Sequence, residues 1–202
     1  MTNRDELSAA AKQKFVEAAT RSKNPLDSLP YSSFTSPCGE KFKLICSAKN
    51  DLDAKTIKWA CKLAEQNVSP FYKLTKIGWQ PKIKQAEHNK AWARYLVAQN
   101  EKNENVAYAM FRFDLDNGDC VLYCYEMQVA SNYQRKGLGR FIMKLLEDCA
   151  RHWHLEKIIL TVLNNNENSK LFYKALDYQK DETSPDVLEE ADYEILSKST
   201  LS

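Results

Sequence analysis

The chain has 202 residues, 28% of them charged, and a formal net charge of +2 at pH 7. A charge so close to neutral does not indicate direct nucleic-acid binding. No apolar run is long enough to span a membrane and the first residues show no secretory pattern, so we expect a protein that stays inside the cell without membrane contact. The six cysteines lack the spacing of a zinc site, which predicts reduced thiols and no bound metal.

Hydrophobic periodicity, capping residues and turn residues locate the elements along the chain. In order, we expect a helix over 5–22, a linker over 24–40, a strand over 42–47, a helix over 54–69 that stops before Pro70, a helical piece over 71–76, a turn and charged segment over 78–90, and strands over 92–99, 106–115 and 121–129. We then expect a glycine loop, a helix over 138–149, a strand over 158–162, a helix over 166–176 and a strand over 193–196. This order predicts an N-terminal helix and linker in residues 1–40 and one α/β domain over residues 41–200.

The loop Gln134–Arg140 joins a strand-like run to a helix-like run. Its two glycines let the backbone approach a ligand closely, and the first N–H groups of a helix have no partner within the helix. Such a loop can bind an anion, and Arg135, Lys136 and Arg140 add positive charge that suits a pyrophosphate. The glycine spacing fits neither a P-loop nor a dinucleotide-binding motif.

The spacing Gln-x-x-Gly-x-Gly over residues 134–139 resembles the GNAT superfamily of acetyl-CoA-dependent N-acetyltransferases. A second segment, Asn166 to Tyr178, is similar to that family's pattern Asn-x-x-Ala-x-x-Leu-Tyr-x-x-x-Gly-Phe, with Ser169 and Asp177 among its departures. The resemblance implies the GNAT fold, an α/β (α+β) arrangement with a mixed, mostly antiparallel sheet of about seven strands, here with an extra N-terminal helix. It also implies acetyl-CoA as the cosubstrate.

The same resemblance implies roles for individual residues. Asn166 would contact the cofactor arm, and Tyr173 would protonate the leaving thiolate. The alternative for these two residues is a helix cap and a core aromatic side chain. The residues expected to bind acetyl-CoA are Met127, Gln128, Val129, Gln134, Arg135, Lys136, Gly137, Leu138, Gly139, Arg140, Thr161, Asn166 and Tyr173.

Several blocks, in order and with nearly fixed gaps, resemble the N-alpha-acetyltransferase D family more specifically. They are Phe111–Asp114, Gly118–Asp119, Val121–Glu126, Arg135–Gly139, Leu160–Val162 and Tyr193–Ser197. That family acetylates the N-terminal α-amine of the two core histones whose mature chains begin Ser-Gly-Arg-Gly. The resemblance implies histone tails as substrate and partner, direct attack in a ternary complex, a monomer, and a location in the nucleus and cytoplasm.

The amine to be acetylated decides how strong a base is needed. At pH 7, freeing the lone pair costs about 1.4 kcal/mol for an α-amine with a pKa of about 8, and about 4.6 kcal/mol for a lysine with a pKa of about 10.4. A weak base is sufficient for an N terminus. Glu126 is the carboxylate nearest the strand end and the glycine loop, so it is the candidate base, acting through a water molecule, with Tyr125 beside it as a second catalytic candidate.

The peptide is expected to contact aromatic and acidic side chains. The expected substrate residues are Tyr72, Ile77, Asp114, Asp116, Tyr123, Tyr125 and Tyr193. By the resemblance, Asp114, Asp116 and Tyr123 contact the peptide's arginine, whereas the alternative is a hairpin with solvated aspartates. Ile77 stands where the family leads us to expect a tryptophan, which affects the packing around the first peptide residues.

Strand geometry sets a condition on the role of Glu126. In a regular strand, Tyr123, Tyr125 and Met127 share one face and Glu126 points to the other. They can serve one cleft only if a bulge or a splayed strand pair redirects the chain. We therefore predict an irregularity at or beside Glu126 and Met127, without which Glu126 would be an exposed strand residue with no catalytic role.

Two other functions are compatible with these motifs. A lysine side-chain acetyltransferase of the same fold would need an open channel for an extended peptide and a stronger base. A non-catalytic histone-tail binding module would use only Asp114 and Asp116. In such a module, Glu126→Gln and Tyr193→Phe would leave function unchanged, whereas an enzyme would lose turnover.

Overall fold

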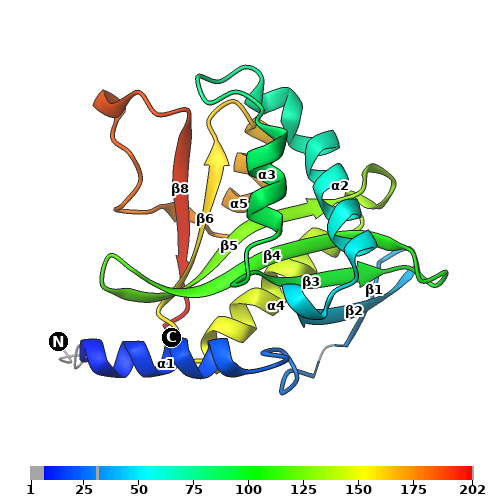
Figure 1. The fold of residues 1–202 in the computed structure, drawn as a ribbon, viewed down its shortest axis with the longest axis horizontal. Coiled ribbons are helices and arrows are strands. Elements are labelled where there is room, and N and C mark those ends of the chain that lie inside the picture. Colours follow the sequence, from blue (N-terminus) through cyan, green and yellow to red (C-terminus); the bar gives the residue numbers. More distant parts are fainter. Residues whose placement is uncertain (1–6, 31, 202) are drawn as a thin grey trace.

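The computed structural model describes residues 7–30 and 32–201, whose strands form one sheet in the order β1-β2-β3-β4-β5-β6-β8-β7 (Figure 1). The strands are β1 (Ser33–Thr35), β2 (Lys41–Ala48), β3 (Arg94–Gln99), β4 (Asn105–Asp116), β5 (Asp119–Val129), β6 (Lys157–Leu163), β7 (Gln179–Lys180) and β8 (Tyr193–Ser199). The helices are α1 (Ala9–Arg21), α2 (Ala54–Tyr72), α3 (Pro81–His88), α4 (Leu138–His152) and α5 (Glu167–Lys174). β5 and β6 run parallel and the other paired strands run antiparallel, which confirms the predicted fold class.

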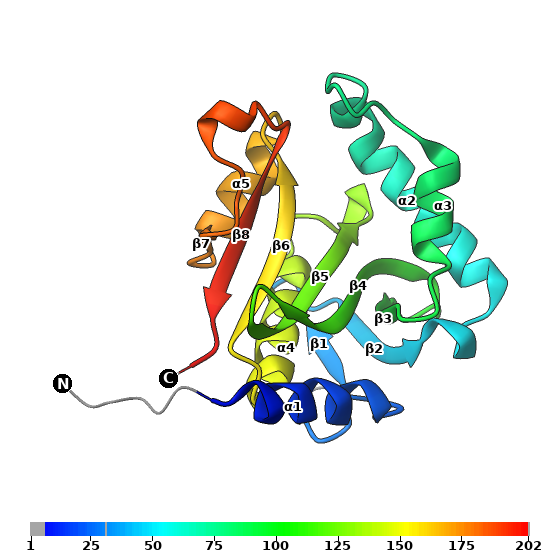
Figure 2. The same cartoon turned by 60° about the vertical axis from the view of Figure 1, so that its left-hand side comes forward.

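Helices cover both faces of the sheet (Figure 2). On one face, Ile57 and Leu63 of α2 pack against Tyr108 and Met110 of β4, and α3 lies beside α2. On the other face, α4 buries a stripe of apolar side chains at three- and four-residue spacing, and α1 packs against β4 and β5. Within residues 7–30 and 32–201, no helix is both long and apolar enough to cross a membrane.

Two short strands were missing from the sequence prediction. β1 lies inside the expected linker and pairs with β2 through three residues, and β7 contains only two residues. Strands this short have too few residues to show a periodic hydrophobic pattern in the sequence. They form because they pair with a longer neighbouring strand. The sheet therefore has eight strands instead of about seven.

The predictions for the helices beside the site were wrong in two places. α2 does not stop before Pro70 but continues to Tyr72, because in the final turn proline removes only one hydrogen bond and the Lys73 N–H closes the helix on the Ser69 carbonyl. The expected helical piece over 71–76 is therefore the end of α2 and a turn. The expected charged segment contains α3, whose signal in the sequence is Pro81 at the first helical position.

The N-terminal helix α1 is tied to the body of the protein. Ser8 caps it, while residues 5 and 6 of the predicted helix lie outside the described residues. Nζ of Lys12 lies 3.0 Å from the Glu156 carboxylate. At the other end, the buried guanidinium of Arg94 donates to the carbonyls of Thr20 and Lys23.

Replacing Arg94 by Met is expected to lower the free energy of unfolding by about 2 kcal/mol, because two backbone carbonyls lose a charged donor. The helix dipole adds to the effect, since Arg94 lies at the C-terminal end of α1. Urea denaturation of both proteins measures the difference. Arg21→Met is the control, because Arg21 forms an exposed pair with Glu17, and such pairs contribute less than about 1 kcal/mol. Equal losses in the two variants would contradict this role of Arg94.

Candidate active site

β5 and β6 separate part-way along their length. They pair from Val121 with Lys157 to Cys124 with Leu160, and no further pair between them occurs in the described part of the chain. Beyond this point β5 pairs with β4 and β6 pairs with β8. The two facing edges therefore leave peptide groups without a strand partner, and a cavity of about 220 Å³ lies between the strands. A ligand with amide groups can bind such an edge as an added strand would.

A bulge in β5 lies beside this cavity. Met110 pairs with Glu126 and Phe111 pairs with Cys124, so Tyr125 is the extra residue, without a partner across β4. This is the irregularity that strand geometry required, and the prediction is confirmed.

The bulge changes which side chains share a face. Because cross-strand partners point the same way, Tyr123 and Glu126 both face α2 and α3. Met127 points to the opposite face, toward Gly139 at the start of α4. Met127 is therefore on the side of the glycine loop, whereas Glu126 is on the side of the two helices.

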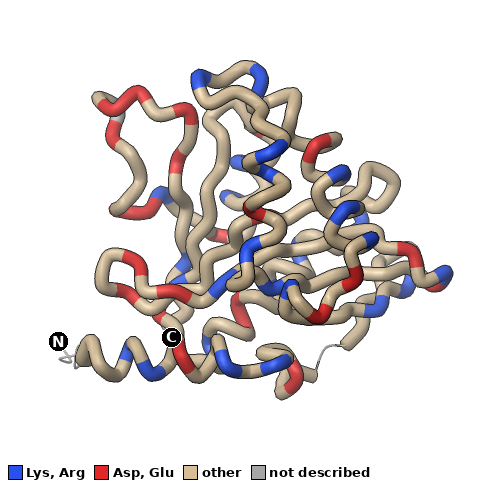
Figure 3. Tube along the Cα trace, viewed as in Figure 1, with Lys and Arg blue, Asp and Glu red and all other residues tan. Residues whose placement is uncertain are grey.

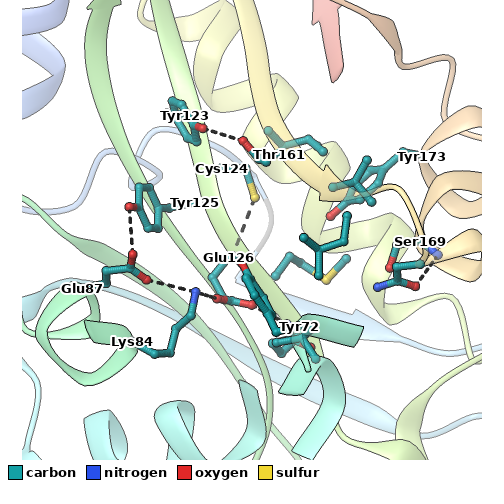
Figure 4. Close-up of a pocket in the computed structure, with 17 residues that line it drawn as sticks. Tyr72, Lys84, Glu87, Tyr123, Cys124, Tyr125, Glu126, Thr161, Ser169 and Tyr173 are labelled. Carbon is teal, nitrogen blue, oxygen red and sulfur yellow. Dashed lines mark hydrogen bonds and ion pairs between the residues drawn. The ribbon is translucent and has the colours of Figure 1, made fainter. Parts of the chain in front are cut away.

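Lys84 of α3 lies between two carboxylates (Figure 4). Its Nζ is 3.1 Å from Oε2 of Glu126 and 3.0 Å from Oε2 of Glu87. Gln128 donates a hydrogen bond to Oε1 of Glu126, so both oxygens of that carboxylate have a donor. Tyr125 donates to Oε1 of Glu87 over 3.4 Å.

The surroundings of this cluster favour its charged form. Burial by itself raises the pKa of Glu126, but Lys84, His88 and the hydrogen bond from Gln128 outweigh burial and hold that pKa below its ordinary value. Burial lowers the pKa of Lys84, but the negative charges, chiefly that of Glu126, raise it above the ordinary value. Glu126 is therefore ionised at neutral pH and, with both oxygens engaged, is a weak base in this arrangement.

A second cavity of about 290 Å³ lies on the α3 side and meets the first. The residues that line both cavities are Tyr72, Lys84, Glu87, Thr161 and Leu163. Of the predicted substrate residues, Tyr72, Ile77 and Tyr193 line this outer cavity, and Tyr123 and Tyr125 line the inner one. The structure thus brings together five of the predicted residues from three separate segments of the chain, around residues 72–77, 123–125 and 193.

Two loops that border the outer cavity contact each other. The backbone N–H of Lys76 donates to Oδ2 of Asp192 over 2.7 Å, and Nζ of Lys76 lies 2.9 Å from the Glu190 carboxylate. Ile77 and Tyr193, which line the cavity, directly follow Lys76 and Asp192 in the chain. The contact therefore joins the two segments that carry Ile77 and Tyr193.

Two of the three residues of the predicted arginine site, Asp114 and Asp116, line neither cavity, whereas Tyr123 lines the inner one. Asp114 and Asp116 are at the end of β4, and Oδ2 of Asp114 is 2.7 Å from Nη2 of Arg112. Arg112 lies two residues earlier on the same face and also packs over the rings of Trp92 and Tyr123. An arginine of the chain itself thus already occupies part of the expected acidic pair.

The glycine loop forms where it was predicted, between β5 and α4. Gly137 has φ +84°, a left-handed conformation that favours glycine, and no side chain caps the helix. In the described ranges, no acceptor is in hydrogen-bond reach of the backbone N–H groups of residues 138–140. A Cβ on Gly139 would lie 3.4 Å from the Phe172 ring and 3.7 Å from the Met127 methyl, so a side chain there would fill the gap between β5 and α5.

Three polar side chains of this loop have partners within the protein. Gln134 donates to the Val129 carbonyl over 3.0 Å, which holds the loop against the end of β5. Nζ of Lys136 lies 2.8 Å from the Glu40 carboxylate. Among the described residues, the contact of Arg140 is a long one, 3.4 Å, to the Ala175 carbonyl. Lys136 must leave Glu40 before it can bind an anion, whereas Arg140 is available at little cost.

α5 places Tyr173 in the inner cavity. Burial raises the pKa of Tyr173 well above its usual value, so the hydroxyl stays protonated at neutral pH. Asn166 accepts a hydrogen bond from the Ser169 N–H over 3.2 Å and also lines the cavity. The helix cap and the cavity position are therefore both found for Asn166, and they do not exclude each other.

The sequence analysis missed Lys84 and Glu87. α3 has no strong apolar period, and its position against β5 depends on contacts between residues 42 positions apart. The available signal was the spacing of Lys84 and Glu87, three residues apart, which is equally common on exposed helices.

The model of the acetyltransferase (GNAT) family matches residues 53–178, more than half of the chain. The chain belongs to the GNAT acetyltransferase family. YdhI, an uncharacterised protein of Bacillus subtilis (strain 168), is 28% identical over 96 residues, which are 48% of this chain and 56% of that protein. The match therefore spans little more than half the length of this curated relative.

Solved structures of GNAT proteins share the fold. A putative GNAT acetyltransferase from Desulfovibrio desulfuricans has a TM-score of 0.59 and 12% identity, covering 78% of this chain and 99% of that one. The ribosomal-protein-S18-alanine N-acetyltransferase of Escherichia coli has a TM-score of 0.54 and 18% identity, covering 79% of this chain and 95% of that one. At these identities the likeness shows a common fold and nothing about the substrate.

Membership of the GNAT family implies acetyl-CoA as the cosubstrate, and the site fits this molecule in two places. The unpartnered N–H groups at the start of α4 suit its pyrophosphate, and the free edge of β5 suits its amide-bearing arm. The bound molecule would supply an activated acetyl thioester. The predicted binding segments 127–129 and 134–140 lie along this path. Thr161 lines both cavities, and its hydroxyl lies within hydrogen-bond distance, 2.8 Å, of the Tyr123 hydroxyl.

Proposed function

We propose that this GNAT protein transfers acetyl from acetyl-CoA to the α-amine of a peptide N terminus, within a ternary complex. The observation that favours it is the contact of Lys76 with Asp192 and Glu190, which joins the two loops that carry Ile77 and Tyr193 of the outer cavity. Loops joined beside the cavity hinder an extended peptide from running straight through it, whereas a chain end can enter. This arrangement favours an N terminus over a lysine within a peptide.

The electrostatics of the site favour the same substrate. The carboxylate of Glu126 has a lowered pKa and two donors, which makes it a poor base for a lysine side chain. An α-amine needs about 3 kcal/mol less to lose its proton at pH 7. A site with only weakly basic carboxylates therefore suits an N terminus better.

Two acidic segments, the β4–β5 hairpin and the segment before β8, favour a basic peptide, such as a histone tail beginning Ser-Gly-Arg-Gly (Figure 3). Their acidic residues include Asp114 and Asp116 at the end of β4, and Glu182, Asp186, Glu189, Glu190 and Asp192 before β8, whereas Asp181 is buried against Lys157. The peptide's arginine would join the existing pair of Asp114 and Arg112, with Asp116 supplying the further negative charge. A location in the nucleus and cytoplasm follows from this substrate and belongs to the same proposal.

The test compares peptides that differ only at the amine. A Ser-Gly-Arg-Gly peptide is incubated with acetyl-CoA and the protein, with its α-amine free or blocked, and the products are identified by mass spectrometry. We expect one acetyl group on the free peptide and none on the blocked one. A lysine-containing peptide with a blocked α-amine is tested in parallel, and its acetylation would instead show a side-chain acetyltransferase. Binding without turnover of any peptide would show a tail-binding module.

A further inference from the structure

The cluster around Lys84 has more negative than positive charge. Two carboxylates, Glu126 and Glu87, lie within ion-pair distance of its single ammonium. One ammonium balances one carboxylate, so one negative charge is left over in a partly buried site. Such a site attracts a second cation, and the α-ammonium of a peptide is the cation that the proposed reaction brings.

The two carboxylates are not equally placed to receive that cation. The Glu126 side chain is 8% exposed, lines only the inner cavity and has donors on both oxygens. The Glu87 side chain is 24% exposed and lines both cavities where they meet. Its Oε2 is buried 3.0 Å from Nζ of Lys84, and its Oε1 accepts only the long hydrogen bond from Tyr125, 3.4 Å, among the described residues. Glu87 is therefore the more exposed and less firmly engaged carboxylate, and it lies where the two cavities meet.

We propose that Glu87 binds the ammonium group of the acyl acceptor and takes its proton, while Lys84 acts as a positioning residue that fixes Glu87 against Glu126. This inference rests on the proposed function and assigns the catalytic base within it. Glu126 then has a different role from the one that the sequence suggested. It holds Lys84 in place from the inner cavity.

The step balances in atoms and charge. One ammonium proton passes to Glu87, and the freed amine forms the new C–N bond to the acetyl carbon as the C–S bond breaks. A second proton leaves the nitrogen to solvent, and the third stays on the nitrogen of the new amide. The thiolate takes a proton from the Tyr173 hydroxyl, and solvent then reprotonates Tyr173. Tyr173 suits this part because it lines the inner cavity and remains protonated.

The pH dependence of two variants tests the assignment. The titratable groups facing Glu87 are Lys84, His88, Tyr72, Tyr125 and Glu126. The pKa values of Lys84 and both tyrosines are raised and those of Glu126 and His88 are lowered, so each is displaced away from pH 7–9. Changes in that range therefore report mainly on the amine, whose pKa is about 8.

We expect Glu87→Gln to lower kcat/KM for the free-amine peptide about 100-fold at pH 7, and this deficit to shrink about tenfold by pH 9, where solvent has already freed the amine. Glu126→Gln should give a deficit that stays constant across the same range, because it acts through position. The KM for acetyl-CoA should be unchanged in Glu87→Gln. Thermal unfolding and acetyl-CoA calorimetry verify that each variant is folded, and Glu65→Gln, on the exposed side of α2, is the control for a lost carboxylate.

Each outcome decides one question. If the deficit of Glu126→Gln shrinks with pH while that of Glu87→Gln is constant or absent, Glu126 is the base and the proposal for Glu87 is overturned. If the unmodified protein acetylates no peptide amine, the proposed function itself is wrong. This result comes from the unmodified protein alone, so it is distinguished from a failure of the proposal for Glu87.

Discussion

Replacing Gly139 by Asp is expected to weaken acetyl-CoA binding about 1000-fold while leaving the fold at least as stable. Gly139 is the second residue of α4, and its N–H is one of three without an acceptor in the described residues. A carboxylate about 4 Å from a pyrophosphate charge opposes it by about 4 kcal/mol at an effective dielectric constant of 20. In the free protein the same carboxylate favours the positive end of the helix dipole.

The geometry at Gly139 allows this substitution. A Cβ would lie 3.4 Å from the Phe172 ring and 3.7 Å from the end of Met127, both of them side-chain tips that can move. Gly139→Asn has the same size without the charge, so it is the matched control. Calorimetric titration with acetyl-CoA and thermal unfolding give the two readouts. Equal affinity of the Asp and Asn variants would place the anion elsewhere on the molecule.

Replacing Lys84 by Met is expected to lower the free energy of unfolding by about 3 kcal/mol at pH 7. Removing one member of a buried ion pair leaves uncompensated charge, and here two carboxylates lose the same partner. Lys82→Met is the matched control, since Lys82 is exposed on the same helix. Urea denaturation measures both, and equal losses would show that the Lys84 cluster does not stabilise the fold.

The loss caused by Lys84→Met should itself depend on pH. In the unmodified protein the pKa of Glu126 lies below its ordinary value, so Glu126 adds stability above that value and loses it as the pH falls through the lowered one. Without Lys84, burial raises the pKa of Glu126, so the charged form destabilises the fold at neutral pH. Protonation relieves that penalty in acid. The difference between the two proteins should therefore narrow between pH 7 and pH 4.

The glycine loop could be predicted because its geometry is local. Strand, two glycines and an amphipathic helix follow one another directly, so residues 134–140, which we expect to bind the pyrophosphate, are also the residues that form the turn. The bulge beside Glu126 was predictable for a related reason. Backbone geometry makes successive side chains of a strand point to opposite faces. Residues that serve one cleft but would point to opposite faces therefore require a bulge between them.

The carboxylate cluster could not be predicted in the same way. It forms because α3, a helix of eight residues with little apolar pattern, places Lys84 and Glu87 against β5. The Arg112 pair was missed for a different reason. Asp114 lies 2.7 Å from Arg112, two residues earlier on the same face of β4, so this contact follows from strand alternation and was within reach of the sequence.

The sequence by itself determined the family fold, the place where the cosubstrate's phosphates are expected and the strand that reaches the reaction centre, because each depends on residues within one turn or one strand. Only the tertiary structure decided which carboxylate lines both cavities, which one has donors on both oxygens, and which loops are joined beside the outer cavity. Those properties arise from desolvation and charge pairing between elements far apart in the chain, and no local pattern specifies them.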